Sequence, residues 1–123
     1  MYLFNRSISV NVRSIDNKAV TIEGTLLDSY HELYLNLEVN LESNTITSAA
    51  GELRRVPYND CKKTQVQIQN LVGINLALNV RKQIQAAVGL DCGCTHLTDL
   101  TLECLKCLAN YKENSPKLLS EET

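Results

Sequence analysis

The first half of the chain alternates hydrophobic and polar residues with the two-residue period of a β-strand. The alternation is clearest from Glu32 to Val39, where Leu33, Leu35, Leu37 and Val39 share one face of the expected strand. The same period, less regular, predicts three further strands, over residues 3–12, 19–27 and 45–53. Because short turns join successive strands, we expect an antiparallel meander.

The second half of the chain has the spacing of helices. Asn59 and Asp60 are favourable N-cap residues, so a helix is expected to begin near Cys61. Val66 and Ile68 fit the spacing of a strand as well as that of a helix, which leaves the type of this element open.

After a break at Gly73, Asn75 is expected to cap a second helix that ends at Gly89. Its apolar stripe comprises Leu76, Val80, Ile84 and Ala87 or Val88. Thr95 is expected to cap the last helix, with Asp99 favourable in its first turn. The apolar stripe of this helix comprises Leu97, Leu100, Cys104, Cys107 or Leu108, and Tyr111.

Strands followed by helices predict an α+β fold: an N-terminal antiparallel β-meander of about four strands, with the helices packed on one face. A chain of 123 residues fits one domain with one modest core. We expect this domain to span residues 1–111. The polar run from Lys112 onward predicts a flexible tail over residues 112–123.

Composition excludes several classes of function. The net charge of −2 argues against a dedicated nucleic-acid binder, which usually carries a basic excess. No apolar run approaches the roughly 20 residues of a membrane-spanning helix, and the first residues do not resemble a secretory signal. We therefore expect a soluble cytoplasmic protein, in which the five cysteines act as thiols or metal ligands and not as a disulfide framework.

The strongest candidate site is the octapeptide Gly-Cys-Thr-His-Leu-Thr-Asp-Leu at residues 93–100. It places Cys94 and His96 where a loop becomes the last helix, and the unpaired N–H groups of a helix start favour the thiolate form of a cysteine. With Cys92 two residues before Cys94, these side chains have a spacing that suits one shared cation. The alternative is a structural turn with a buried thiol.

Further ligands are expected from two other places. His31 follows Asp28 in the hairpin between the second and third strands, and Cys61 lies at another junction of loop and helix. Helices stacked on the sheet bring their starts and this hairpin to one end of the domain. Asp28 or His31, Cys61, and Cys94 or His96 would then form a mixed set suited to zinc or iron. The alternative for His31 and Cys61 is a structural role.

Other residues of reactive type are interpreted as structural. Cys104 and Cys107 have half the spacing of a zinc knuckle, but both thiols fall on the apolar stripe of the last helix and are expected in the core. The cationic pairs are expected on a solvated face, with an anion pocket as the alternative. These pairs are Arg54-Arg55, Lys62-Lys63 and Arg81-Lys82.

The octapeptide resembles the signature of a bacterial family called domain of unknown function 2889. The resemblance covers most of the chain and includes Glu23-Gly24, Leu27-Asp28 before His31, Leu35-x-Leu37-x-Val39, Pro57-Tyr58 before Cys61, and Leu71-Val72-Gly73. The chain departs from the family pattern at its start, which is shorter, and in an abbreviated loop before His31. Membership implies no activity, because the family is uncharacterised.

The order of the candidate ligands is similar to that in the NifU/IscU/SufU scaffold proteins, which assemble an iron–sulfur cluster or hold zinc. This resemblance implies a NifU/SufE-like fold. It matches Asp28 or His31 to the hairpin ligand, Cys61 to the second cysteine, and Cys94 with His96 to the final pair. The first cysteine of those proteins is absent here and the final pair is Cys-x-His. A mononuclear zinc or iron site is therefore favoured over an iron–sulfur cluster.

Three functional hypotheses follow. The first is a small metal-binding protein, related to iron–sulfur or metal/sulfur handling. Its ligands would be His31, Cys61, Cys94 and His96, with Asp28 as an alternative ligand or as a partner that orients one. The second is a metal-free sulfur carrier or redox module with Cys61 or Cys94 as nucleophile. The third is a protein-interaction domain in which these residues are structural.

The expected partner in the first two hypotheses is a metal or sulfur donor or acceptor protein. Nucleic acid and membranes are not expected partners. The sequence leaves open whether the chain is an enzyme and whether it forms a homo-oligomer.

Overall fold

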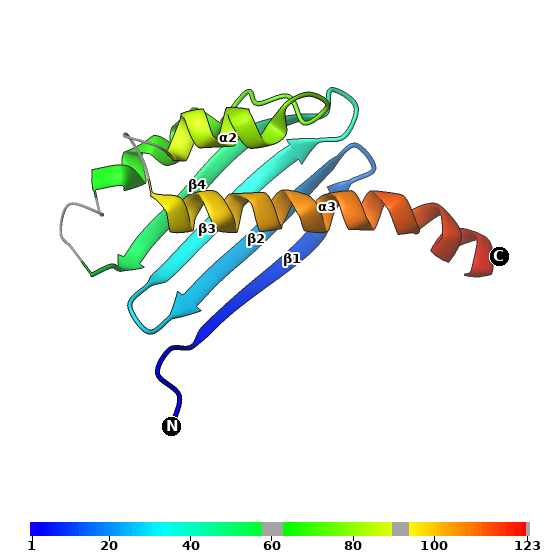
Figure 1. Ribbon diagram of the computed structural model, residues 1–123. Coiled ribbons are helices and arrows are strands. Elements are labelled where there is room, and N and C mark those ends of the chain that lie inside the picture. The colour runs from blue at the N-terminus through cyan, green and yellow to red at the C-terminus, as the bar shows by residue number, and fades with distance from the viewer. Residues whose placement is uncertain (58–62, 90–93, 123) are drawn as a thin grey trace.

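The computed structural model describes residues 1–57, 63–89 and 94–122. Four strands form one antiparallel sheet in the order β1-β2-β3-β4 (Figure 1). Their bounds are β1 Arg6–Asp16, β2 Ala19–Asp28, β3 Glu32–Asn40 and β4 Thr45–Arg55. The predicted meander is therefore confirmed, with strand ends that differ by a few residues from those expected.

Three helical elements follow the sheet. They are the 3-10 helix η1 (Lys63–Leu71) and the α-helices α2 (Val80–Val88) and α3 (Thr95–Glu122). In Figure 1, α3 crosses the face formed by β1, β2 and β3. The helix η1 packs against β4, and α2 packs against η1 and α3. The predicted α+β layout is thus confirmed. None of the described helices is long and apolar enough to cross a membrane.

The core lies between one face of the sheet and the helices. Alternate residues of β2 and β3 are buried there, and the residues between them are mostly half-buried on the opposite face. At Gly24 of β2 the helix lies close to the strand, because an added Cβ atom would lie 2.5 Å from the Cys104 Sγ atom of α3. Cys104 is fully buried, as its place on the apolar stripe predicted, and Cys107 is half-buried.

The start of α2 differs from the prediction. Asn75 does not cap it; the helix begins at Val80, after Asn79 in the left-handed conformation (φ 48°). Asn75 instead forms a local turn, in which its Oδ1 accepts a hydrogen bond from the Ala77 N–H at 2.8 Å. The Gln83 side chain closes this loop by donating to the carbonyl oxygens of Asn75 (2.7 Å) and Leu78 (2.6 Å). The segment therefore satisfies its polar groups without a helix.

The other predicted helix ends also shift. Thr95 is the first residue of α3, and the carbonyl oxygen of Cys94 accepts the Thr98 N–H at 3.0 Å, so the N-cap position falls on Cys94 and not on Thr95. At its other end α3 runs on past Lys112 to Glu122. The division into a domain and a flexible tail at Lys112 stays a prediction. The expected helix start near Cys61 lies outside the described residues; the part described, η1, is 3-10 helix.

Candidate functional site

The candidate site begins with the hairpin that joins β2 to β3. Asp28 shares the inward face of β2 with Leu26, and His31 precedes Leu33 on the inward face of β3, so strand alternation turns both polar side chains toward the helices. Within the turn, the Asp28 Oδ1 atom accepts the N–H groups of Tyr30 (2.8 Å) and His31 (2.6 Å). This side-chain-to-backbone turn fixes the direction of both side chains.

The two side chains of the hairpin also bond to each other. The His31 Nδ1 atom lies 2.9 Å from the Asp28 Oδ1 atom, and the side chains are 8% and 0% exposed. Because an ionised carboxylate only accepts hydrogen bonds, Nδ1 is the donor. In a neutral imidazole the lone pair then resides on Nε2, the atom through which His31 is able to bind a ligand.

Two arginines clamp the hairpin from either side. Arg6, the cross-strand partner of Asp28, donates from Nε (3.3 Å) and Nη2 (3.1 Å) to the Asp28 Oδ2 atom. Arg55, at the end of β4, donates to the carbonyl oxygens of Ser29 (2.9 Å), Asp28 (2.9 Å) and His31 (3.4 Å). Arg6 was not predicted as a functional residue, and Arg55 was expected on a solvated face. In the sequence, Arg6 lies as many residues before Asn17 as Asp28 lies after it. A hairpin with its turn at Asn17 therefore pairs Arg6 with Asp28.

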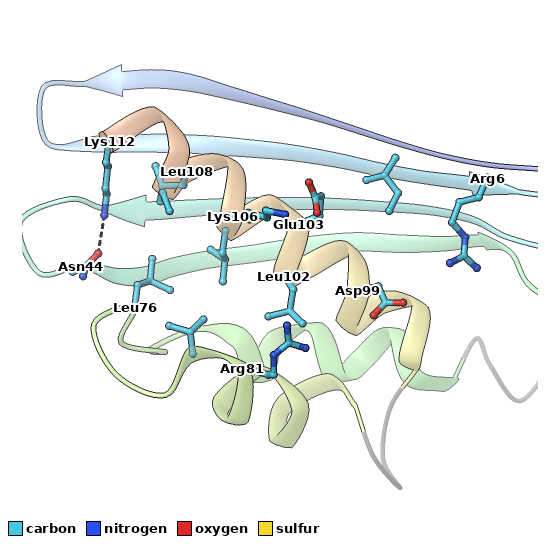
Figure 2. A pocket seen from close by; sticks show the side chains of 14 residues that line it. Arg6, Asn44, Leu76, Arg81, Asp99, Leu102, Glu103, Lys106, Leu108 and Lys112 are labelled. Atoms are coloured by element: carbon cyan, nitrogen blue, oxygen red, sulfur yellow. Dashed lines mark hydrogen bonds between the residues drawn. The ribbon is translucent and has the colours of Figure 1, made fainter. Parts of the chain in front are cut away.

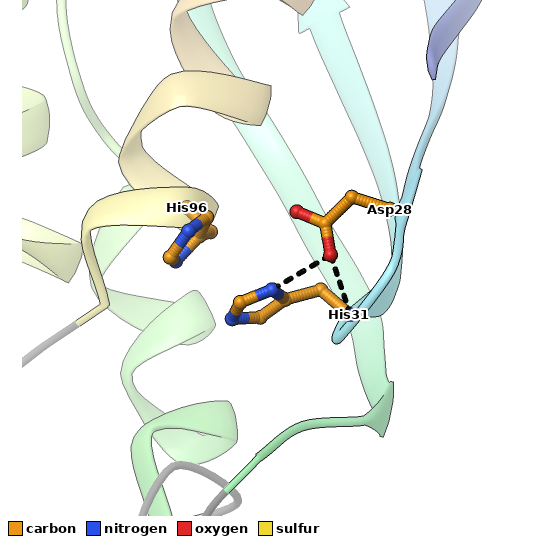
Figure 3. Close-up of side chains that lie close together, drawn as sticks. All are labelled: Asp28, His31 and His96. Carbon is orange, nitrogen blue, oxygen red and sulfur yellow. Dashed lines mark hydrogen bonds and ion pairs between the residues drawn. The ribbon is translucent and has the colours of Figure 1, made fainter. Parts of the chain in front are cut away.

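His96 completes the cluster from the first turn of α3. Its ring stacks on that of His31, with ring centroids 3.8 Å apart and planes inclined by 29° (Figure 3). The start of the helix is anchored by Cys94, whose N–H donates to the Val88 carbonyl oxygen at 2.7 Å. The half-buried Cys94 Sγ atom lies 4.0 Å from the His96 Nδ1 atom. A thiol therefore lies close to the His96 imidazole.

The surroundings of the cluster shift the pKa of Asp28 and of His96. Burial by itself would raise the pKa of Asp28, but hydrogen bonds from the Tyr30 N–H, His31 and Arg6 hold it well below its usual range, so the carboxylate stays ionised. Burial lowers the pKa of His96, and the charges of His31 and Arg6 lower it further. A neutral His96 offers a lone pair near neutral pH.

Asp28, His31 and His96 together form the candidate cluster. One potential ligand atom from each lies within 4.8 Å of those of the other two (Figure 3). Of the residues that the sequence predicted as ligands, the structure brings these three together, and Cys94 lies beside His96. Cys61 and Cys92 lie outside the described residues. A carboxylate and two imidazoles in this arrangement are suited to a divalent transition metal.

Comparison with known proteins identifies the family of the chain. No curated protein and no solved structure matches it significantly, so the likeness in layout to the NifU/IscU/SufU proteins stays a prediction. One family model matches residues 4–109, which include the hairpin, the sheet and the part of α3 that carries His96. The chain therefore belongs to the family described as "Protein of unknown function (DUF2889)".

Proposed function

We propose that this protein binds one divalent metal ion at the cluster of Asp28, His31 and His96. The observation that carries the proposal is the convergence of these three donors, within 4.8 Å, from a hairpin and a helix start that are distant in the sequence. The lowered pKa of His96 supports it, because a protonated imidazole cannot bind a metal.

The hydrogen bonds suggest a distinct role for Asp28. Its Oδ1 atom already accepts three N–H groups of the hairpin, and its Oδ2 atom accepts the guanidinium of Arg6. Carboxylates that hold the second nitrogen of a ligating histidine fix its orientation and raise its basicity. Asp28 would therefore orient His31, whose Nε2 atom would bind the metal.

Cys94 is then the third candidate ligand, beside His96. Two histidines and one cysteine are typical ligands of Zn²⁺, and three protein ligands leave a fourth position for water or a small molecule. If Arg6 released Asp28, the set would become two histidines and a carboxylate, which is typical of non-haem Fe(II). A thiolate from Cys94 would favour zinc, whereas a carboxylate from Asp28 would suit either zinc or Fe(II).

The test is elemental analysis of protein purified anaerobically without a histidine tag. We expect about one zinc or iron per chain, lost in both His31→Ala and His96→Ala. Loss in Cys94→Ser would assign the thiolate as a ligand, and metal retained in Cys94→Ser would leave Asp28 as the third candidate ligand. Cys107→Ser, on α3 outside the cluster, is the matched control and should keep its metal. Full metal content in both histidine variants would overturn the proposal.

A metal-free thiol function is the second candidate, favoured by the distance of 4.0 Å between Cys94 Sγ and His96 Nδ1. Burial raises the pKa of Cys104 to about 12 and also raises that of Cys107, so these two stay thiols near neutral pH. Alkylation mapped by mass spectrometry should then modify Cys94 faster than Cys104 or Cys107, and His96→Ala should slow it. Absence of both bound metal and a fast thiol would favour a plain interaction domain.

A further inference from the structure

A second feature lies beside α3, outside the metal cluster. It is a groove of about 720 Å³ bounded by α3, by the start of α2 with the loop before it, and by the start of β1 (Figure 2). Its apolar lining includes Leu76, Val80, Leu102 and Leu105. This volume falls within the range of about 300–1,000 Å³ that is usual for small-molecule sites in proteins.

The charges along the groove differ from those of the whole chain. The chain has 12 cationic and 14 acidic side chains, yet the groove is lined by four cations and only two acids. The cations are Arg6, Arg81, Lys106 and Lys112, and the acids are Asp99 and Glu103. Positive charge is therefore concentrated around an apolar lining, on a protein of net negative charge.

Two of these cations are available to a ligand. Arg6 is engaged by Asp28 at 3.1 Å, and the Lys112 Nζ atom donates to the Asn44 side chain at 2.9 Å. Arg81 and Lys106, in contrast, have no ion-pair partner among the residues that the structure describes. They belong to different helices, α2 and α3, and both line the groove.

We propose that this groove binds a single-chain anionic amphiphile, a carboxylate with an aliphatic tail. The tail would lie on Leu76, Val80, Leu102 and Leu105, and the carboxylate would pair with Arg81 and Lys106. The volume favours a small molecule over an acidic peptide helix, which is about 10–12 Å across with its side chains and would leave most of its surface outside. The inference goes beyond the proposed metal site and requires no metal.

The experiment is calorimetric titration of the full chain with decanoate, with and without a chelator. We expect decanoate to bind at least about tenfold more tightly than decyltrimethylammonium, which has the same tail with the opposite charge. It should also bind at least about tenfold more tightly than butyrate, whose tail buries less apolar surface. Equal affinity for the cationic and anionic amphiphiles would overturn the proposal.

Two pairs of variants test the location. Arg81→Glu and Lys106→Glu should each weaken decanoate binding at least about tenfold, whereas Lys82→Glu, next to Arg81 but outside the lining, should leave it unchanged. Ala109→Phe places a ring in the groove and should abolish binding, whereas Ala86→Phe, on the exposed surface of α2, should not. Unchanged binding in the charge variants and in Ala109→Phe would overturn the proposal.

Two further measurements distinguish a fatty-acid groove from a peptide-binding surface and from a ligand held by the metal. An acidic amphipathic peptide that binds more tightly than decanoate and displaces it would overturn the proposal in favour of a protein partner. Retained decanoate binding in His96→Ala would support a groove independent of the metal cluster. Binding that needs added zinc and is lost in His96→Ala would overturn it, because the ligand would then sit on the metal.

Discussion

The imidazole rings of His31 and His96 stack with their centroids 3.8 Å apart, although one belongs to the hairpin between β2 and β3 and the other to the first turn of α3. Two protonated rings at this separation would repel each other. The contact therefore favours a state in which at least one ring is neutral, in agreement with the lowered pKa of His96. The same contact ties the stability of the fold to pH.

The stability of the metal-free protein should fall as the pH drops below 6.5, the ordinary pKa of His96. Because the folded state lowers this pKa, the unfolded chain binds more protons between the folded value and 6.5, so the free energy of unfolding rises with pH through that window. Above 6.5 the contribution is fully present. Urea denaturation at several pH values would measure it. His96→Gln should flatten this part of the curve, and a parallel curve for the variant would contradict the assignment.

Asp28→Ala should lower the free energy of unfolding by about 3 kcal/mol, because it leaves buried N–H groups and the Arg6 guanidinium without their acceptor. Asp28→Asn should lower the free energy of unfolding by less, because the amide oxygen still accepts hydrogen bonds from the N–H groups of the hairpin. Chemical denaturation is the measurement. Asp16→Ala is the matched control: the Asp16 carboxylate also accepts a turn N–H, that of Lys18, but it is exposed, so the loss should be smaller. Equal losses at the two turns would contradict the role of burial.

Acid should remove the contribution of Asp28 separately from that of His96. The pKa of Asp28 is lowered in the folded state, so its stabilisation is present above 3.8, its ordinary value, and is lost as the pH falls below it. Acid unfolding followed by circular dichroism should show this step in the wild type and in His96→Gln. It should be absent from Asp28→Asn.

Gly24→Ala should destabilise the protein by roughly 1–3 kcal/mol, because the new Cβ atom would meet the Cys104 Sγ atom at 2.5 Å and the Leu100 Cδ1 atom at 3.1 Å. Replacing Cys104 by alanine makes room for it. The double variant should therefore lose less stability than the sum of the two single variants, with a coupling of about 0.5–3 kcal/mol. Strict additivity in this cycle would show that α3 does not rest on β2 at this point.

The sequence predicted well those elements in which hydrophobic residues recur at a regular spacing. Alternation along β2 places Asp28 on the inward face, and alternation along β3, continued back by two residues, does the same for His31. The apolar stripe of α3 places Cys104 in the core. The predicted start of the second helix at Asn75 was wrong, because a contact with a residue distant in the sequence determines the conformation there. Asn75 forms an isolated bridge with Thr45 of β4, so the chain stays extended there instead of beginning a helix.

At the candidate site, too, local patterns predicted some features and long-range contacts determine the others. The sequence predicted that Asp28, His31 and His96 lie at one end of the domain, and the structure brings them together. Their binding of a metal stays a prediction. The arginines that hold the hairpin depend on strand register and on where β4 ends, and residue type alone marks them only as surface cations. Their roles become visible only when distances between the strands are known.

Arg55→Ala should lower the free energy of unfolding by roughly 1.5–3 kcal/mol, because the guanidinium bonds three carbonyl oxygens of the site hairpin. Arg54→Ala is the matched control. Arg54 pairs with Glu32 and Glu52 on the exposed face of the sheet, and such pairs contribute about 0–1 kcal/mol. Thermal denaturation of both variants is the measurement. A greater loss of stability in Arg54→Ala would contradict the role of Arg55 in holding the hairpin.

Metal removal provides the last prediction. If the cluster binds a metal only in the folded state, free metal at about 100 times its dissociation constant should add about 2.7 kcal/mol to the free energy of unfolding, and a chelator should remove that gain. His96→Ala should show neither the gain nor the loss, since it deletes a ligand and leaves the sheet intact. Cys107→Ser should behave as the wild type does, because its thiol lies outside the cluster. The measurement is the melting temperature of each protein with zinc, with iron(II) under anaerobic conditions, and with chelator. A shift of equal size in His96→Ala would place the metal elsewhere on the chain.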